Sequence, residues 1–162
     1  MVLVNIPEQR KAVLIGKEGG TKRKIESLSG TKIFVGDEIQ IEGDAENLIK
    51  TSEIIKAIGR GFPPETALKL GDERFCLDVI NIKGSPNTIK RLLSRVIGTD
   101  GKAKQNIQNL TGASIAVYGK TVSIIGDYKQ MENARVAVEM LLAGRKHTTV
   151  WRYLENINKQ EV

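Results

Sequence analysis

A short glycine motif, Gly-x-x-Gly, occurs twice in this chain of 162 residues. The first copy runs from Gly16 to Gly19, and the second, from Gly98 to Gly101, begins 82 residues later. Glycine tolerates positive φ and has no side chain, so such a turn lets another backbone come close. Where a helix begins directly after the turn, its free N–H groups and its dipole favour an anion. The motif therefore indicates a place where a phosphate backbone can lie against the protein.

The two motifs are parts of a longer duplication. Each is preceded by isoleucine and followed by isoleucine, leucine, glycine and isoleucine at matching positions. After an insertion of one residue the match resumes and continues through Asp44 and Asp127. Two copies are too few for a solenoid, so we predict two modules. The expected division is module 1 over residues 1–60, a connecting segment over 61–72, module 2 over 73–144 and a C-terminal extension over 145–162.

The apolar pattern predicts the order β-α-α-β-β-α in both copies. Alternation over residues 31–35 and 38–42 predicts a hairpin, and Asp44 is placed to cap the long helix that follows. Ser85 before a proline predicts the next helix start. Residues 147–158 have helical spacing and no visible counterpart in the first copy, so we expect an extra C-terminal helix. The fold class is α+β, with a three-stranded sheet packed on helices in each module.

Composition excludes several classes of function. The chain has one Cys, so it cannot form an internal disulfide. One Cys and one His cannot supply the usual four zinc ligands, so no cofactor or metal is expected. We find no signal peptide and no apolar run long enough to span a membrane, which favours the cytoplasm. No nucleophile has an evident partner base, so the chain is not expected to be an enzyme.

Positive charge is concentrated around the two motifs. The net charge is +6, which points to a polyanion as partner. Lys83 to Lys120 holds seven basic residues and one acid, whereas Glu8 to Gly36 holds seven basic residues and three acids. The second motif therefore has the more positive surroundings. Aromatic residues make up 4% of the chain, too few for a binder built on stacking platforms.

The motif with its flanking residues resembles the KH domain. The shared pattern is Ile-Gly-x-x-Gly, an apolar residue six positions after the second glycine, then Leu-x-Gly-x-x-Ile leading into a strand. The order β-α-α-β-β-α is that of the type I arrangement. The resemblance implies a clamp on about four single-stranded nucleotides, with their backbone on the glycine turn and their bases in an apolar groove.

The whole chain is similar to archaeal homologues of a small-subunit ribosome-assembly factor, the KH-domain "partner of Nob", which also interacts with the rRNA dimethylase. The supporting segments are Gly59–Pro64, Arg95–Gly98 and Gly144–Glu155. The resemblance implies binding near the 3′ end of small-subunit rRNA and help to a nuclease that trims this end. An rRNA 3′-end endonuclease or an initiation factor is the expected protein partner, and no membrane is involved.

We expect the second module to hold the main RNA site, with lysines pairing phosphates and apolar residues shaping the base groove. Its candidate residues are Arg95, Ile97, Gly98, Thr99, Asp100, Gly101, Lys102, Lys104, Ile115 and Val117. In the first module, which extends the RNA path or docks a protein, they are Gly16, Lys17, Glu18, Gly19 and Lys22.

Two alternatives stay open: an accessory factor of RNA degradation or translation, and a protein-docking module with vestigial turns. The direct test from the sequence is Gly98→Asp with Gly101→Asp, which we expect to abolish most binding while the fold survives.

Overall fold

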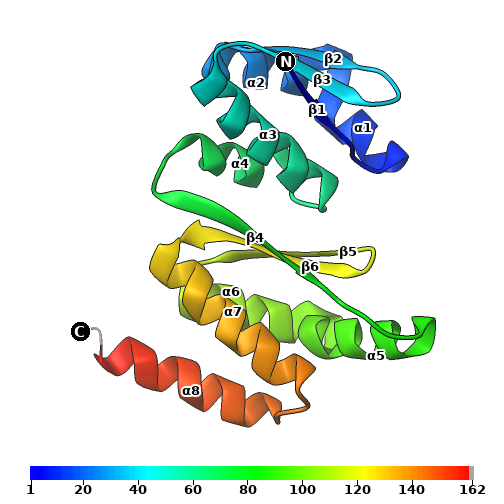
Figure 1. Cartoon of the computed structure of the whole chain (residues 1–162). Helices are drawn as coiled ribbons and strands as arrows, with labels where there is room; N and C mark the ends of the chain where they lie inside the picture. Colours follow the sequence, from blue (N-terminus) through cyan, green and yellow to red (C-terminus); the bar gives the residue numbers. More distant parts are fainter. Residues whose placement is uncertain (161–162) are drawn as a thin grey trace. The chain divides into compact units, whose positions relative to one another are not determined.

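The structure, a computed structural model, describes residues 1–160 and divides into two compact units. The first comprises Met1–Phe75, and the second begins at Cys76 (Figure 1). Whether residues 61–72 act as a connector between modules stays a prediction. None of the helices in residues 1–160 is both long enough and apolar enough to cross a membrane.

The first unit begins with the predicted order β-α-α-β-β-α. Its strands form an antiparallel sheet in the order β1-β3-β2, with Ile41 of β3 opposite both Val2 and Ile33. Its elements are β1 (Val2–Val4), α1 (Glu8–Ile15), α2 (Gly20–Ser29), β2 (Lys32–Val35), β3 (Ile39–Glu42), α3 (Ala45–Gly59), α4 (Pro64–Ala67) and the 3-10 turn η2 (Leu68–Gly71).

The second unit repeats this order with longer elements. Its sheet has the equivalent strand order, β4-β6-β5, so the predicted α+β fold with a three-stranded sheet in each module is confirmed. Its elements are β4 (Phe75–Asn81), α5 (Pro86–Ile97), α6 (Lys102–Thr111), β5 (Ser114–Tyr118), β6 (Thr121–Asp127), α7 (Tyr128–Leu142) and α8 (His147–Gln160).

Equivalent apolar positions of the two copies form the two cores. Ile25 of α2 and Ile107 of α6 are fully buried, and so are Ile41 of β3 and Ile124 of β6. β2 and β3 bury alternate side chains, because successive side chains of a strand point to opposite faces, whereas β6 is buried at six consecutive residues. The apolar pattern that revealed the duplication is therefore the pattern of residues that face the core.

The predicted C-terminal helix α8 is present, and the first unit has a short segment in the equivalent place. Four residues separate α3 from α4, and four separate α7 from α8. α8 packs on α6 and α7, while α4 and η2 pack on the equivalent helices α2 and α3 (Figure 1). The sequence did not reveal this correspondence, because the segment is short and ends at Gly71, so no helical period builds up in it.

In both units an arginine of the first helix holds the end of the long helix. The Nε of Arg95 donates to the carbonyl of Leu141 at 2.9 Å, and its Nη2 donates to the carbonyl of Arg145. The Leu141 carbonyl lies in the last turn of α7, where carbonyls have no partner within the helix, and the Arg145 carbonyl lies in the segment after it. The arginine therefore ties α5 to the segment that leads into α8.

The first unit makes the same connection from another position. Arg10 of α1 donates to the carbonyls of Ile58 and Phe62 at 2.8 and 2.9 Å. Each of these carbonyls lies 83 residues before the carbonyl that Arg95 engages in the second unit. The two copies thus share the positions of the acceptor carbonyls, while the donor arginine lies about one helical turn later in α5 than in α1.

Asp44 and Asp127 occupy equivalent helix starts but cap differently. Asp127 accepts a hydrogen bond from the backbone N–H of Gln130 at 2.8 Å, and the Gln130 side chain accepts one from the Asp127 backbone. The Asp44 side chain makes no capping hydrogen bond, although it stands at the predicted N-cap position. The sequence placed the N-cap at Asp44 correctly, but it did not reveal that this side chain makes no capping hydrogen bond.

This difference predicts unequal costs of truncation. Asp127→Ala should lower the free energy of unfolding of the second unit by about 1 kcal/mol, because it removes one half of a capping box. Asp44→Ala should cost the first unit less than half of this amount. Denaturant unfolding of both variants measures the two losses, and equal losses would contradict the geometry described here.

Candidate nucleic-acid interface

The two glycine turns have nearly the same backbone conformation. Gly98 has φ 75° and ψ 176°, and Gly16 has φ 73° and ψ −178°. The acids within the motifs, Asp100 and Glu18, both adopt positive φ, at 55° and 54°. Non-glycine residues rarely adopt this conformation. Its recurrence in both copies marks the turn as a preserved geometry.

Within the second turn, the two glycines are needed for different reasons. A Cβ added to Gly98 would lie 2.6 Å from the Cβ of Ala103 and 2.7 Å from its backbone nitrogen. A Cβ added to Gly101 would meet no atom within 4 Å, although φ is +74° there too. Gly98 therefore allows α6 to pack close to the turn. Gly101 leaves its outer side open to another molecule.

The N-terminus of α6 opens beside Gly101. Its N-cap is this glycine, which offers no side chain to the first N–H groups, and its first turn holds no acid. Lys102 is exposed and Lys104 is half-buried. Free N–H groups and the positive end of the helix dipole favour an anion at such a position. A phosphate can be held here by backbone groups and by lysine charge together.

Two adjoining hollows extend from this turn between the helices and β5. One has a volume of about 430 Å³ and the other about 320 Å³, and Ile97 and Val117 line both. Asp100, Gly101 and Lys104 line the smaller hollow. Five of the residues predicted from the sequence therefore lie in one groove.

Ile115 behaves differently from these five residues. It is 3% exposed and belongs to the core behind the groove, so it supports the surface from within.

The groove also contains residues that sequence reasoning did not name. Leu93 adds apolar surface, and Gln108 adds an amide close to Lys104. Lys90 and Lys120 stand on its two sides, and Tyr118 adds an aromatic ring. The two lysines were present in the charge count of this segment. Nothing in the spacing of Tyr118 distinguished it from a strand residue of the core.

One difference between the copies leaves a lysine of the second groove without an ion-pair partner. Lys22 of α2, the equivalent of Lys104, forms an ion pair with Glu26 at 3.3 Å. Glu26 also accepts the backbone N–H of Ile33, and Gln108 accepts the equivalent bond in the second unit at 2.8 Å. Because Gln108 is neutral, it completes the sheet edge without neutralising a lysine. Among residues 1–160, Lys104 has no ion-pair partner.

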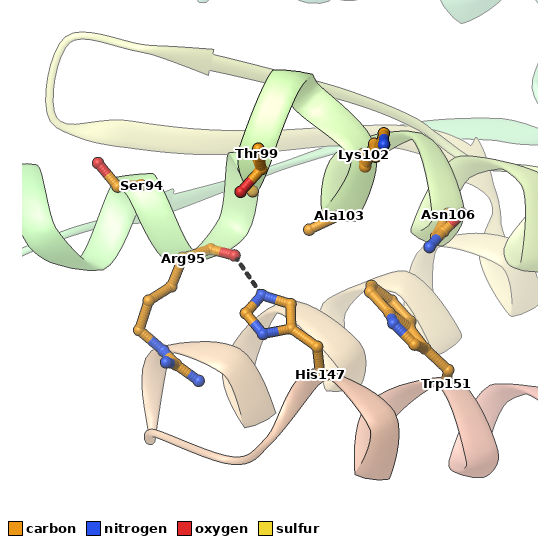
Figure 2. A pocket seen from close by; sticks show the side chains of 9 residues that line it. Ser94, Arg95, Thr99, Lys102, Ala103, Asn106, His147 and Trp151 are labelled. Atoms are coloured by element: carbon orange, nitrogen blue, oxygen red, sulfur yellow. Dashed lines mark hydrogen bonds between the residues drawn. The ribbon is translucent and has the colours of Figure 1, made fainter.

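The remaining predicted residues of the second module lie elsewhere around the turn. Arg95, Gly98, Thr99 and Lys102 line a separate pocket between the turn and α8 (Figure 2). The guanidinium of Arg95 is engaged with backbone carbonyls, as described above, so a direct contact of this residue with RNA stays a prediction. In the first unit, Lys17 and Glu18 are exposed, and Gly16 and Gly19 are half-buried.

The single cysteine is not part of either surface. Its Sγ lies 3.2 Å from the sulfur of Met131 and 3.5 Å from the carbonyl of Gly126. Burial raises the pKa of the Cys76 thiol, and the nearby carboxylates of Asp78 and Asp127 raise this pKa further. The thiolate is the reactive form, so this environment disfavours a role as nucleophile.

Comparison with known families identifies both modules. Residues 76–159 match the family described as eukaryotic type KH-domain, or KH-domain type I. Residues 1–57 match the KH domain. The two matches together cover both glycine turns and reach almost to the end of α8.

Relatives with similar sequences include archaeal and eukaryotic proteins. A KH domain-containing protein of Methanocaldococcus jannaschii is 42% identical over 163 residues, covering 94% of this chain and 72% of that protein. The RNA-binding protein pno-1 of Caenorhabditis elegans is 30% identical over 120 residues, covering 70% of this chain. The chain spans 43% of that longer relative.

Solved structures agree with these relatives. Dim2p from Pyrococcus horikoshii superimposes with a TM-score of 0.89 at 42% identity, covering 96% of this chain and 98% of that one. The matching chain in the a/eIF2alpha–aDim2p–rRNA complex from the same organism gives a TM-score of 0.90, also at 42% identity, covering 98% and 94%. The chain described here belongs to the family of KH-domain proteins, within the tandem-KH group that includes PNO1 and Dim2.

Proposed function

We propose that this chain binds single-stranded RNA of the small ribosomal subunit, near the 3′ end of the rRNA. By holding that segment it assists pre-rRNA processing and subunit assembly, and it catalyses no reaction itself. The observation that carries the proposal is the second glycine turn. There an uncapped helix N-terminus, an open Gly101 and an unpaired Lys104 adjoin a groove with apolar walls.

This arrangement suits a single strand better than a duplex. The turn offers backbone N–H groups to phosphates, and the groove beside it offers Ile97, Leu93 and Val117 to unstacked bases. The bases of a duplex are stacked inside the helix and cannot reach such a groove. The relative solved in complex with rRNA supports rRNA as the RNA concerned.

The protein partners follow from the same group of relatives. The complex from Pyrococcus horikoshii also contains a/eIF2alpha, which supports an initiation factor as partner of this chain. A 3′-end endonuclease is the second partner in the proposal, because a protein that holds the 3′ segment can present it for cutting. Both interactions would occur in the cytoplasm.

Salt dependence tests whether RNA binding uses phosphate contacts. With four to six contacts, the logarithm of the binding constant should fall against the logarithm of salt concentration with a slope of about −3 to −4. The probe is a single-stranded fragment of the small-subunit rRNA 3′ end, with a duplex of the same sequence as control. A slope near zero, or equal affinity for the duplex, would contradict the proposal and favour a protein-docking role.

A further inference from the structure

A pocket between the second glycine turn and α8 is separate from the groove described above. It has a volume of about 570 Å³, within the range of small-ligand sites, roughly 300–1,000 Å³. Thr99 and Lys102 come from the turn and the start of α6, and Asn106 lies one helical turn further along. His147 and Trp151 rise from α8 toward these residues (Figure 2).

The α8 wall of this pocket is held in place before any ligand binds. A ring nitrogen of His147, Nε2, donates to the carbonyl of Arg95 at 3.0 Å, since a carbonyl can only accept. The His147 and Trp151 rings lie 5.9 Å apart at 51°. Trp151 is half-buried and packs partly against the core of the unit. A ligand that stacks on this indole therefore meets a surface with little freedom left to lose.

The chemistry of the pocket matches that of a nucleotide. Lys102 supplies a positive charge, Thr99 a hydroxyl, and Asn106 an amide with both donors and an acceptor. The indole of Trp151 offers a stacking face, and no carboxylate lines the pocket. Figure 2 shows the Asn106 side chain directed from α6 toward Trp151, so a polar edge and an aromatic face converge.

The first unit has a hollow in the equivalent place, but with different chemistry. That hollow, of about 280 Å³, is lined by Pro64 and Leu68, which lie 83 residues before His147 and Trp151. Glu65 adds an acid there, beside Lys17 and Lys24. The copies thus share the position of the hollow, while the stacking ring and the absence of negative charge are properties of the second.

We propose that the pocket beside Trp151 binds one nucleotide of single-stranded RNA that flanks the segment held in the groove. Its base stacks on the indole, the amide of Asn106 faces the edge of the base, and Lys102 lies close to the phosphate. Gly98 and Thr99 belong to both the pocket and the turn, so one strand can pass from the groove across the turn into the pocket. The inference rests on the proposed RNA-binding function.

The chain supplies its own probe, because Trp151 is its only tryptophan. Stacking of a base on an indole quenches the fluorescence of the indole. In the full chain, a single-stranded RNA of about four nucleotides, enough for one KH groove, should leave the emission nearly unchanged. An RNA with the same core, extended to about eight nucleotides, should quench it on saturation.

Affinity measurements with variants separate stacking from fold stability. Trp151→Leu copies the first unit and should weaken binding of the longer RNA about tenfold, with the shorter RNA changed by less than about twofold. Trp151→Phe should restore most of the lost affinity. Tyr153→Leu, on the same helix and outside the pocket, is the matched control, and thermal unfolding of each variant confirms that α8 stays folded.

The outcomes distinguish this inference from the function on which it rests. Quenching by the longer RNA alone, together with the loss in Trp151→Leu, supports the flanking site. If the longer RNA binds without quenching, or Trp151→Leu binds as well as Tyr153→Leu, the inference is overturned and RNA binding stands. If a protein partner quenches Trp151 and RNA does not, the pocket is a protein site. If neither RNA binds, both proposals fail.

Discussion

Thr99→Asp is expected to weaken binding of the rRNA fragment about tenfold or more. Thr99 is exposed on the second turn, directly before Asp100, so the substitution places two neighbouring carboxylates where a phosphate would lie. Two charges about 5 Å apart near a protein surface repel by roughly 1–3 kcal/mol, which corresponds to a loss of that size. Fluorescence anisotropy with a labelled fragment at constant salt measures the change.

Two control variants show whether the loss comes from charge at this turn. Thr99→Asn has nearly the same shape as Thr99→Asp without the charge, and it should bind within about threefold of the unmodified chain. Lys17→Asp changes the equivalent position of the first turn and reverses a charge. Even so, Lys17→Asp should weaken RNA binding less than Thr99→Asp does if the second groove is the main site. A larger loss in Lys17→Asp would assign the main site to the first module.

Gly98→Ala is expected to have the largest effect on stability, lowering the free energy of unfolding by about 2–6 kcal/mol. A methyl group there would lie 2.6–2.7 Å from Ala103, and its backbone contact cannot be relieved by a side-chain rotation. Positive φ with ψ near 180° adds about 1–3 kcal/mol of strain for a residue with a Cβ, and overpacking adds about 1–3 kcal/mol. Denaturant unfolding of the full chain measures the loss.

Gly101→Ala is the comparison variant, because φ is positive there too and the surroundings are open. Its ψ of 11° places Gly101 in the left-handed helical region, where an alanine is less strained than at Gly98 with ψ 176°. Gly101→Ala should lower the free energy of unfolding by the backbone strain alone, about 1–2 kcal/mol. Equal losses in the two variants would show that α6 moves away from the turn easily and that close packing at Gly98 is unimportant.

The same geometry changes how the RNA site should be tested. Replacing Gly98 and Gly101 together by aspartate was expected to spare the fold, but the contacts of Gly98 make this expectation wrong. Loss of RNA binding in that double variant would combine repulsion of phosphate with disruption of the turn. Thr99→Asp introduces charge at an exposed position and avoids this ambiguity.

Local features of the chain could be predicted well from the sequence. The strands predicted over residues 31–35 and 38–42 agree with β2 and β3 to within one residue. Ser85 caps α5 through the backbone N–H of Thr88, as its position before a proline indicated. Such features depend on residues within one or two turns, and those residues are adjacent in the sequence.

The candidate site was predicted in part. Spacing and charge located the turn, Ile97, Val117 and Lys104, because the repeated motif contains them or lies beside them. Tyr118 was missed because its lining position depends on how β5 sits against α5. Arg95 was expected to flank the RNA, but its guanidinium holds a carbonyl 46 residues away, at the end of α7.

By itself, the sequence determined the duplication, the order of the elements, the two glycine turns and the excess of positive charge around the second. Each depends on residue type and on short spacings, which a backbone of fixed geometry converts directly into local structure. The tertiary structure decided which glycine packs and which stays open, that Gln108 leaves Lys104 unpaired, and that Trp151 of α8 faces the turn. These relations join residues brought together by packing, and no local preference of the chain specifies them.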